Sequence, residues 1–231
     1  MKIAIITALC GDREKLCNPP VIHQNADYFA FVDNKIEGTI WNQKETLNFT
    51  IDTRYKNRRN AKIYKILPFL FVPNYDYYIW HDVSHAVVEN PETICTKYME
   101  DNSFGFFKHT ARNCVYQEAE ELLKLGYDHT ENIKRQMASY RNDGYPDNNG
   151  LFELSAFVLK NTKDVQETCL TWWELICRYA SRDQLSLPYS LWKNKVTNQV
   201  AVFPGFSNGI NSRGTWGNNT LIPQVRAHAG G

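Results

Sequence analysis

An aromatic and apolar run near the middle of the chain, Tyr77-Tyr78-Ile79-Trp80, ends abruptly at the polar sequence His81-Asp82-Val83-Ser84-His85. A short apolar run closed by polar groups is typical of a buried β-strand. In an open α/β sheet, ligands bind outside the carboxyl ends of the strands, so polar groups placed there lie where chemistry is usually done. The sequence therefore predicts a functional site where this strand ends.

The hydrophobic pattern of the rest of the chain alternates between strands and helices. It predicts strands over residues 2–9, 27–32, 75–80, 104–107 and 151–159, and helices over 61–71, 90–99, 115–125, 131–140, 165–180 and 185–192. Pro68 must end or kink the first of these helices. We expect one α/β domain over residues 1–193 and a loop-rich tail over 194–231, rich in Gly and Asn, that either closes over a site or is partly mobile.

Charge and cysteine content narrow the class of protein. The 26 basic and 25 acidic residues nearly cancel, so composition gives no support for a nucleic-acid or anionic-membrane partner, although a nucleic-acid partner stays open. The six cysteines show no CxxC pair, which favours reduced thiols and a cytoplasmic location. The apolar run within residues 1–10 is too short for a signal peptide or a membrane span, and we expect neither.

Asp82 is the primary candidate for chemistry. A carboxylate at the end of a buried strand can coordinate a hard divalent cation, which would neutralise the charge of a bound diphosphate. The structural alternative is an ordinary turn acid. His85 is the reserve metal ligand, whereas His81, beside Trp80, is as well explained as a core residue.

Three further segments carry candidate residues. Lys108 to Asn113 follows a predicted strand and precedes a helix, a setting that suits phosphate or hydroxyl-rich ligands. Arg182-Asp183-Gln184 lies between two apolar segments, where Asp183 could take a proton from an acceptor hydroxyl while its neighbours orient the substrate. Glu118 and Asp183 could equally be helix-capping acids, and Glu153 an ordinary strand acid.

Motifs in a fixed order carry a family resemblance. They are Cys10-Gly11-Asp12, residues 27–34, residues 61–68, Tyr78-Ile79-Trp80-His81-Asp82, residues 108–119, Gly150-Leu151-Phe152-Glu153, Trp172-Trp173 and residues 181–193. In this order they resemble a glycosyltransferase-like family of unknown-function domains. That family includes plant mucilage and pollen-turgor proteins and many bacterial polysaccharide-locus proteins.

The resemblance implies a GT-A-like, Rossmann-like fold with a central, mainly parallel mixed sheet flanked by helices. It also implies a nucleotide-sugar donor, a hydroxyl acceptor such as a surface glycan, and a divalent metal, Mn²⁺ or Mg²⁺. The family's metal-site acid is kept as Asp82, but Val83 stands where glycine is usual and Phe69 where histidine is frequent. Lys62 replaces a common arginine, which keeps the charge but loses the bidentate fork for phosphate.

Roles follow from the resemblance position by position. Asp82 and His85 would hold the metal, and Asp183 would be the catalytic base. The donor nucleotide would lie near Thr7, Gly11, Asp33, Lys62 and Lys65. The sugar or acceptor would be bound by His109, Arg112, Glu118, Glu153, Arg182 and Gln184.

Two other functions fit parts of the sequence. Asp82 with His81, His85 and His109 could form the metal centre of a phosphohydrolase, although the spacing has no HxxxH-like or paired-acid signature. Alternatively, the six tryptophans and thirteen tyrosines could stack on sugars in a non-catalytic carbohydrate-binding module, although most of them have core-like spacing.

Overall fold

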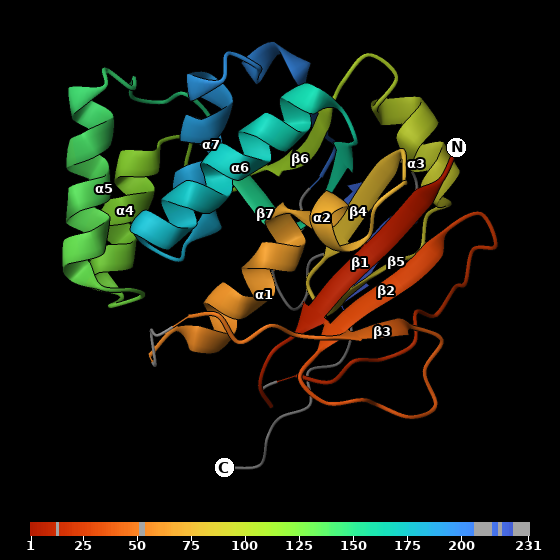
Figure 1. The fold of residues 1–231 in the computed structure, drawn as a ribbon. Helices are drawn as coiled ribbons and strands as arrows, with labels where there is room; N and C mark the ends of the chain where they lie inside the picture. Colours follow the sequence, from red (N-terminus) through yellow and green to blue (C-terminus); the bar gives the residue numbers. More distant parts are fainter. Residues whose placement is uncertain (13, 51–53, 206–213, 217–218, 224–231) are drawn as a thin grey trace.

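A computed structural model describes residues 1–12, 14–50, 54–205, 214–216 and 219–223, and its central feature is a seven-stranded sheet in the order β3-β2-β1-β4-β7-β6-β8 (Figure 1). The strands are β1 (Ile3–Leu9), β2 (Asp27–Val32), β3 (Asn42–Glu45), β4 (Tyr77–His81), β6 (Phe104–Lys108), β7 (Phe152–Lys160) and β8 (Val200–Phe203). Neighbouring strands run parallel except for β7, which is antiparallel to both β4 and β6. The predicted α/β fold with a mixed, mainly parallel sheet is confirmed.

Helices pack on both faces of this sheet. They are α1 (Lys56–Ile66), α2 (Pro68–Phe71), α3 (Pro91–Tyr98), α4 (Val115–Lys124), α5 (Thr130–Asn142), α6 (Lys163–Arg178) and α7 (Asp183–Lys193), followed by the 3-10 turn η1 (Thr197–Gln199). As Pro68 requires, α1 ends at Ile66 and a separate short helix begins at the proline. In Figure 1, α1 and α6 cross the near face of the sheet, and α4 and α5 stand beside its edge.

The pleat of the strands divides the core between the two faces. Along β1, Ala4 and Ile6 join a cluster with α1, α6 and α7, whereas Ile3 and Ile5 join a cluster with α3. This is the alternation expected when both faces of a strand are covered. A third cluster packs α4 and α5 against α7, so α7 connects the sheet to the outer helices.

Sheet pairing extends past residue 193, where the sequence placed the start of a tail. β8 pairs in parallel with β6 at the edge of the main sheet, and Phe203 is buried there. Strand β5 (His85–Val87) pairs with β10 (Asn219–Pro223), which also pairs with β9 (Gly214–Trp216), in a small second sheet. Residues 206–213, 217–218 and 224–231 lie outside the described part of the chain, so closure of a site by the tail stays a prediction.

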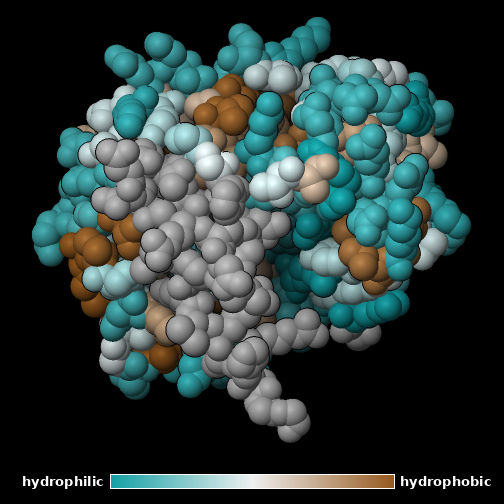
Figure 2. Space-filling view, turned by 180° about the vertical axis from the view of Figure 1, so that it is seen from behind, coloured by the Kyte–Doolittle hydropathy of each residue, from teal (hydrophilic) through white to brown (hydrophobic). Residues whose placement is uncertain are grey.

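The face of the molecule seen in Figure 2 is mainly polar outside its grey part. In the part of Figure 2 that is not grey, hydrophobic residues form separate small patches among hydrophilic ones. Among the residues described, no helix is long and apolar enough to cross a membrane.

Candidate functional site

A cavity of about 780 Å³ opens at the edge of the sheet where β1 and β4 end. Because β4 and β7 are antiparallel, the beginning of β7 reaches this same edge, and the Asp82 N–H donates to the Ser155 carbonyl at 2.7 Å. Helix α1 from its first turn to Lys65, the first turn of α7 and the turn between α4 and α5 also line the cavity. The cavity therefore lies where the sequence predicts a site.

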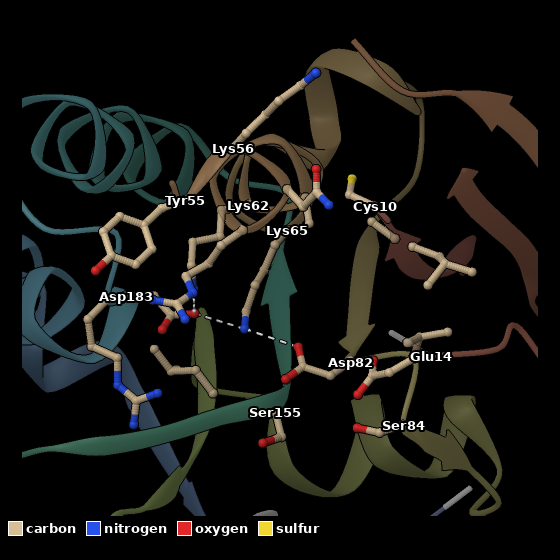
Figure 3. A pocket seen from close by; sticks show the side chains of 18 of the residues that line it. Cys10, Glu14, Tyr55, Lys56, Lys62, Lys65, Asp82, Ser84, Ser155 and Asp183 are labelled. Carbon is tan, nitrogen blue, oxygen red and sulfur yellow. Dashed lines mark hydrogen bonds and ion pairs between the residues drawn. The ribbon is translucent and has the colours of Figure 1, made fainter. Parts of the chain in front are cut away.

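Asp82 projects from the end of β4 into the cavity (Figure 3). Its side chain is 41% exposed, and its Oδ1 accepts hydrogen bonds from Trp80 Nε1 at 2.8 Å and Lys65 Nζ at 3.2 Å. The indole holds the carboxylate in one orientation while leaving it accessible. This is the geometry of an acid that can meet a ligand.

Lys62 and Lys65 lie one turn apart on α1 and face the same carboxylate, Asp183, in the first turn of α7. Each Nζ is 2.8 Å from Asp183 Oδ2. All three side chains are nearly buried, and Lys65 also reaches Asp82, so the four charged groups form one line across the cavity (Figure 3). The i, i+3 spacing of the two lysines on a helix is what brings them together.

Burial and pairing set the proton affinities of this group. Burial lowers the pKa of Lys62 to about 8 against the opposing attraction of Asp183. Burial also disfavours the Lys65 ammonium, but Asp183 and Asp82 outweigh it and leave the Lys65 pKa above its ordinary value. Burial alone would raise the pKa of Asp183, yet Lys62, Lys65 and Arg182 hold it well below the usual range.

A second polar cluster lies behind the cavity, centred on Glu118 of α4. Glu118 is 1% exposed and accepts hydrogen bonds from Arg112 Nε at 2.7 Å and Arg182 at 3.3 Å, with His109 Nε2 at 3.7 Å. Burial lowers the pKa of His109 despite the nearby Glu118 carboxylate. Only Arg182 of this cluster lines the cavity among the described residues, and Glu118 supports it from behind.

The two remaining residues predicted to bind the sugar or acceptor, Glu153 and Gln184, lie in different places: only Gln184 lines the cavity. Glu153 is fully buried on β7 and accepts a hydrogen bond from Thr110 at 3.1 Å, away from the cavity lining. Gln184 does line the cavity. Its side chain is 4% exposed, and its Oε1 has no hydrogen-bond partner within the described structure.

The predicted nucleotide residues at the ends of β1 and β2 form a connected turn. The Gly11 N–H donates to Asp33 Oδ2 at 2.7 Å, and Gly11 has a φ of +83°, a conformation that favours glycine. Burial and the neighbouring Asp33 raise the pKa of Cys10, which lines the cavity, to about 12. Thr7 is fully buried within β1 and does not line the cavity.

The two histidines beside Asp82 turn away from the cavity. His81 is buried at the end of β4, and burial lowers its pKa to about 4 despite the Asp82 carbonyl 3.0 Å from its Nδ1. His85 begins β5, is 6% exposed and has Nδ1 3.1 Å from the Ser84 hydroxyl. Within the described residues, no three His, Cys, Asp or Glu side chains are grouped as a metal site.

Several lining residues were not singled out as site candidates from the sequence. They are Glu14, Tyr55, Ser84, Tyr127 and Ser155. Nothing in the local pattern marks them, because each comes from a loop or strand end that only tertiary packing brings to the cavity. Arg54, Lys56 and Arg58 also line it.

The chain is a glycosyltransferase-like domain. The TOD1/MUCI70 glycosyltransferase-like domain model matches residues 1–208, and the chain belongs to that family. The family predicted from the ordered motifs is confirmed.

Individual relatives are more distant. The chain is 28% identical over 155 residues to "Probable hexosyltransferase MUCI70" of Arabidopsis thaliana, a match that covers 60% of this chain and 25% of the plant protein. The chain thus spans only a quarter of that relative.

Among solved structures, the galactosyltransferase LgtC in complex with donor and acceptor sugar analogues is 11% identical, with a TM-score of 0.46 over 88% of this chain and 73% of LgtC. The WbbM bifunctional glycosyltransferase is also 11% identical, with a TM-score of 0.44 over 87% of this chain and 38% of WbbM. Both TM-scores are below 0.5, so the fold is assigned from the strand order of the sheet and not from these two structures.

Proposed function

We propose that this chain is a GT-A-like glycosyltransferase that moves a sugar from a nucleoside-diphosphate sugar to a hydroxyl acceptor, such as a surface glycan, in the cytoplasm. One observation carries the proposal: an accessible carboxylate, Asp82, lies beside the buried Lys65 and Lys62 in a cavity at the carboxyl edge of the sheet. Membership of a glycosyltransferase-like family supports it. The six cysteines are all free thiols, which supports the cytoplasmic location.

The residues present fit a divalent cation such as Mn²⁺ or Mg²⁺. Mg²⁺ is commonly held by one or two carboxylates together with substrate phosphates and water, and Asp82 offers an accessible carboxylate whose Oδ1 is engaged by Trp80 and Lys65. Asp82 would hold the ion, whose charge would stabilise the leaving diphosphate. His85 lies outside the cavity lining, so the proposal rests on Asp82.

Lys62 and Lys65 would bind the donor diphosphate. Buried ammonium groups that already face a carboxylate are oriented before the ligand arrives, and they compensate negative charge as it develops on the leaving group. The turn of Gly11 and Asp33 would lie toward the nucleoside, with Cys10 on the cavity wall. Arg182 and Gln184 would orient the acceptor or the transferred sugar.

Asp183 is proposed in a different role from the catalytic base suggested by its sequence position. A carboxylate whose pKa is held well below its usual range by two lysines takes up a proton poorly. Asp183 would instead fix the positions of Lys62 and Lys65. In the chemical step, the acceptor hydroxyl would attack the anomeric carbon as the bond from that carbon to the diphosphate oxygen breaks, and the hydroxyl proton would pass to the departing nucleoside diphosphate.

Calorimetry across a panel of nucleotide sugars, with Mn²⁺ and with EDTA, tests the proposal. We expect one donor to bind, more tightly with the metal, and Asp82→Asn to abolish the effect of the metal. Lys134→Gln, an exposed change on α5, is the matched control. If no nucleotide sugar binds under either condition, the transferase proposal fails, and metal-dependent release of phosphate from simple esters would favour a phosphohydrolase.

A further inference from the structure

Five side chains alternate along the wall of the cavity in the order Arg54, Tyr55, Arg58, Tyr127 and Arg182, and we call them the arginine–tyrosine wall. The guanidinium carbons of Arg54 and Arg58 are each 5.1 Å from the centre of the Tyr55 ring. On the Tyr127 ring, the corresponding distances are 4.0 Å for Arg58 and 4.9 Å for Arg182. These distances are those of cation–π contacts, which hold planar guanidinium groups against aromatic rings.

The wall is held rigidly from behind. Arg58 donates to the Tyr127 carbonyl at 2.9 Å, and Arg182 donates to the Tyr127 hydroxyl at 3.2 Å. The segment that carries Tyr127 is fixed by the next residue, Asp128, whose buried carboxylate accepts hydrogen bonds from the Ser181 N–H and hydroxyl. Preorganised groups lose little freedom when they bind, which favours a recognition role over a solvated surface.

Positive charge gathers where α1 begins. Six basic and three acidic side chains line the cavity; Asp82 and Asp183 pair with Lys62 and Lys65, and Arg182 pairs with Glu118 behind the lining. Within the described residues, no carboxylate pairs with Lys56 or Arg58. This part of the cavity therefore favours a second anion, separate from the diphosphate proposed to bind Lys62 and Lys65.

The N-terminus of helix α1 also favours a bound anion. Its first turn begins at Lys56, contains no acidic residue and receives no side-chain cap from Tyr55 at the N-cap position. Cations at a helix N-terminus oppose the helix dipole, so Lys56 and Arg58 are unfavourably placed unless an anion binds beside them. The N-terminus of α1 and the arginine–tyrosine wall therefore both favour a bound anion.

A buried polar group points to a hydroxyl-bearing ligand in the same place. Gln184, which follows Arg182 and Asp183 on α7, lines the cavity with its Oε1 buried and without a partner in the described structure. A buried acceptor of this kind is satisfied when a ligand hydroxyl donates to it. In Figure 3, Tyr55 lies on the opposite side of Lys62 and Asp183 from Asp82, so this region is separate from the proposed metal position.

We infer that the arginine–tyrosine wall binds an acidic acceptor, a saccharide that carries a carboxylate or a phosphate, beside the donor diphosphate. This inference rests on the proposed function. The guanidinium groups would bind the anion through paired N–H donors, and Gln184 would accept from a sugar hydroxyl. The anionic group would orient the acceptor without taking part in bond formation.

Calorimetry on protein saturated with the nucleoside diphosphate of its donor tests the inference. The probes are a hyaluronan tetrasaccharide, which carries carboxylates, neutral chitotetraose, and glucose 6-phosphate against glucose. We expect the acidic member of at least one pair to bind about tenfold more tightly than the neutral one, without displacing the nucleotide. The pair that shows the preference identifies carboxylate or phosphate as the recognised group.

Variants assign the preference to the wall. Arg58→Gln should remove most of it and Arg58→Lys should restore part, whereas Arg178→Gln, an exposed change on α6, should leave it intact. If Arg58→Gln does not fold, the double variant Arg54→Gln/Lys56→Gln, on the rim of the same wall, replaces it. Equal binding of acidic and neutral probes, or of none, overturns the inference.

Competition separates this inference from the proposed function. If the nucleoside diphosphate and the acidic probe displace each other, the wall belongs to the donor site and the acceptor inference fails while the transferase proposal stands. If no nucleotide sugar binds, the transferase proposal fails on its own measurement. The acidic probes are then tested on the free protein, and only loss of their preference contradicts the wall as an anion site.

Discussion

Lys65 and Asp183 form a buried ion pair, with 2.8 Å between Nζ and Oδ2, that joins the end of α1 to the beginning of α7. Lys62 shares the same carboxylate oxygen, and Lys65 continues to Asp82 at the end of β4. The end of α1, the beginning of α7 and the end of β4 are therefore joined by charged side chains inside the cavity. The arrangement ties the stability of the fold to the chemistry of the site.

Asp183→Asn should destabilise the protein by about 3 kcal/mol, because it removes the counter-charge of the buried Lys62 and leaves Lys65 with Asp82 alone. Urea unfolding at neutral pH measures the change. Adding Lys62→Met should recover part of the loss, since it removes the unpaired charge. Glu131→Gln, an exposed acid in the first turn of α5, is the control. A loss no larger than that of the control would contradict the buried ion-pair description.

Stability should rise with pH above about pH 8 because of Lys62. Burial lowers its pKa from 10.5 to about 8 in the folded protein, so between these values the unfolded chain holds more protons than the folded one. Stability then increases with pH, by at most about 1.4 kcal/mol per pH unit for a single group. The measurement is the difference in unfolding free energy between the wild type and Lys62→Met from pH 7 to 10. A difference that falls with pH would give the opposite sign and refute the assignment.

Donor binding should change in the opposite direction over the same pH range. If Lys62 binds the diphosphate, loss of its proton above about pH 8 weakens that contact, so the dissociation constant of the nucleoside diphosphate should rise. Lys62→Arg keeps its charge at all these pH values and should flatten the profile. A rise that persists unchanged in Lys62→Arg would assign the titration to another group.

Much of the site could be predicted from local sequence. The position of Asp82 directly after a buried strand predicts its place in the site. The family resemblance of the ordered motifs predicts the places of Lys62 and Lys65. Their mutual pairing with Asp183 could not be read from the sequence, because residues more than a hundred positions apart meet only when α1 and α7 pack. That pairing turns a candidate base into a candidate anchor for two lysines.

Two strands, β3 and β8, and the position of Tyr127 could not be predicted from the sequence. Strand β3 is short and polar, with the sequence Asn-Gln-Lys-Glu, so no hydrophobic alternation marks it. Phe203 ends the apolar run of β8, Val200–Phe203, but this run is short and precedes a stretch rich in Gly and Asn, so its pairing with β6 and the burial of Phe203 appear only in the structure. In the same way, Tyr127 occupies an ordinary turn in the sequence and gains its place in the cavity from Asp128 and Arg58.

Glu118→Gln should impair acceptor use more than donor binding. Glu118 is buried behind the cavity and holds Arg182, which lines it, together with Arg112. Loss of its charge frees Arg182, so we expect the acceptor KM to rise about tenfold with little change in donor affinity. Arg112→Gln, which leaves Arg182 paired, is the matched comparison. Equal effects of the two variants on the acceptor KM would show that Glu118 acts only through general stability.

Gly11→Ala should disturb the junction between the β1 turn and α1. Gly11 has a φ of +83°, and a Cβ built on it would clash with Asn57 Nδ2 in the first turn of α1. Left-handed backbone in a non-glycine residue costs roughly 1–2 kcal/mol, and displacement of Asn57, which lines the cavity, should add weaker nucleotide binding. Gly38→Ala has a similar φ of +72° with nothing within 4 Å of the new Cβ, so it reports the backbone strain alone. Unfolding and nucleotide titration of both variants separate the two effects. Adding Asn57→Ala to Gly11→Ala should reduce the stability loss to that of Gly38→Ala, and no reduction would exclude the Asn57 contact as its cause.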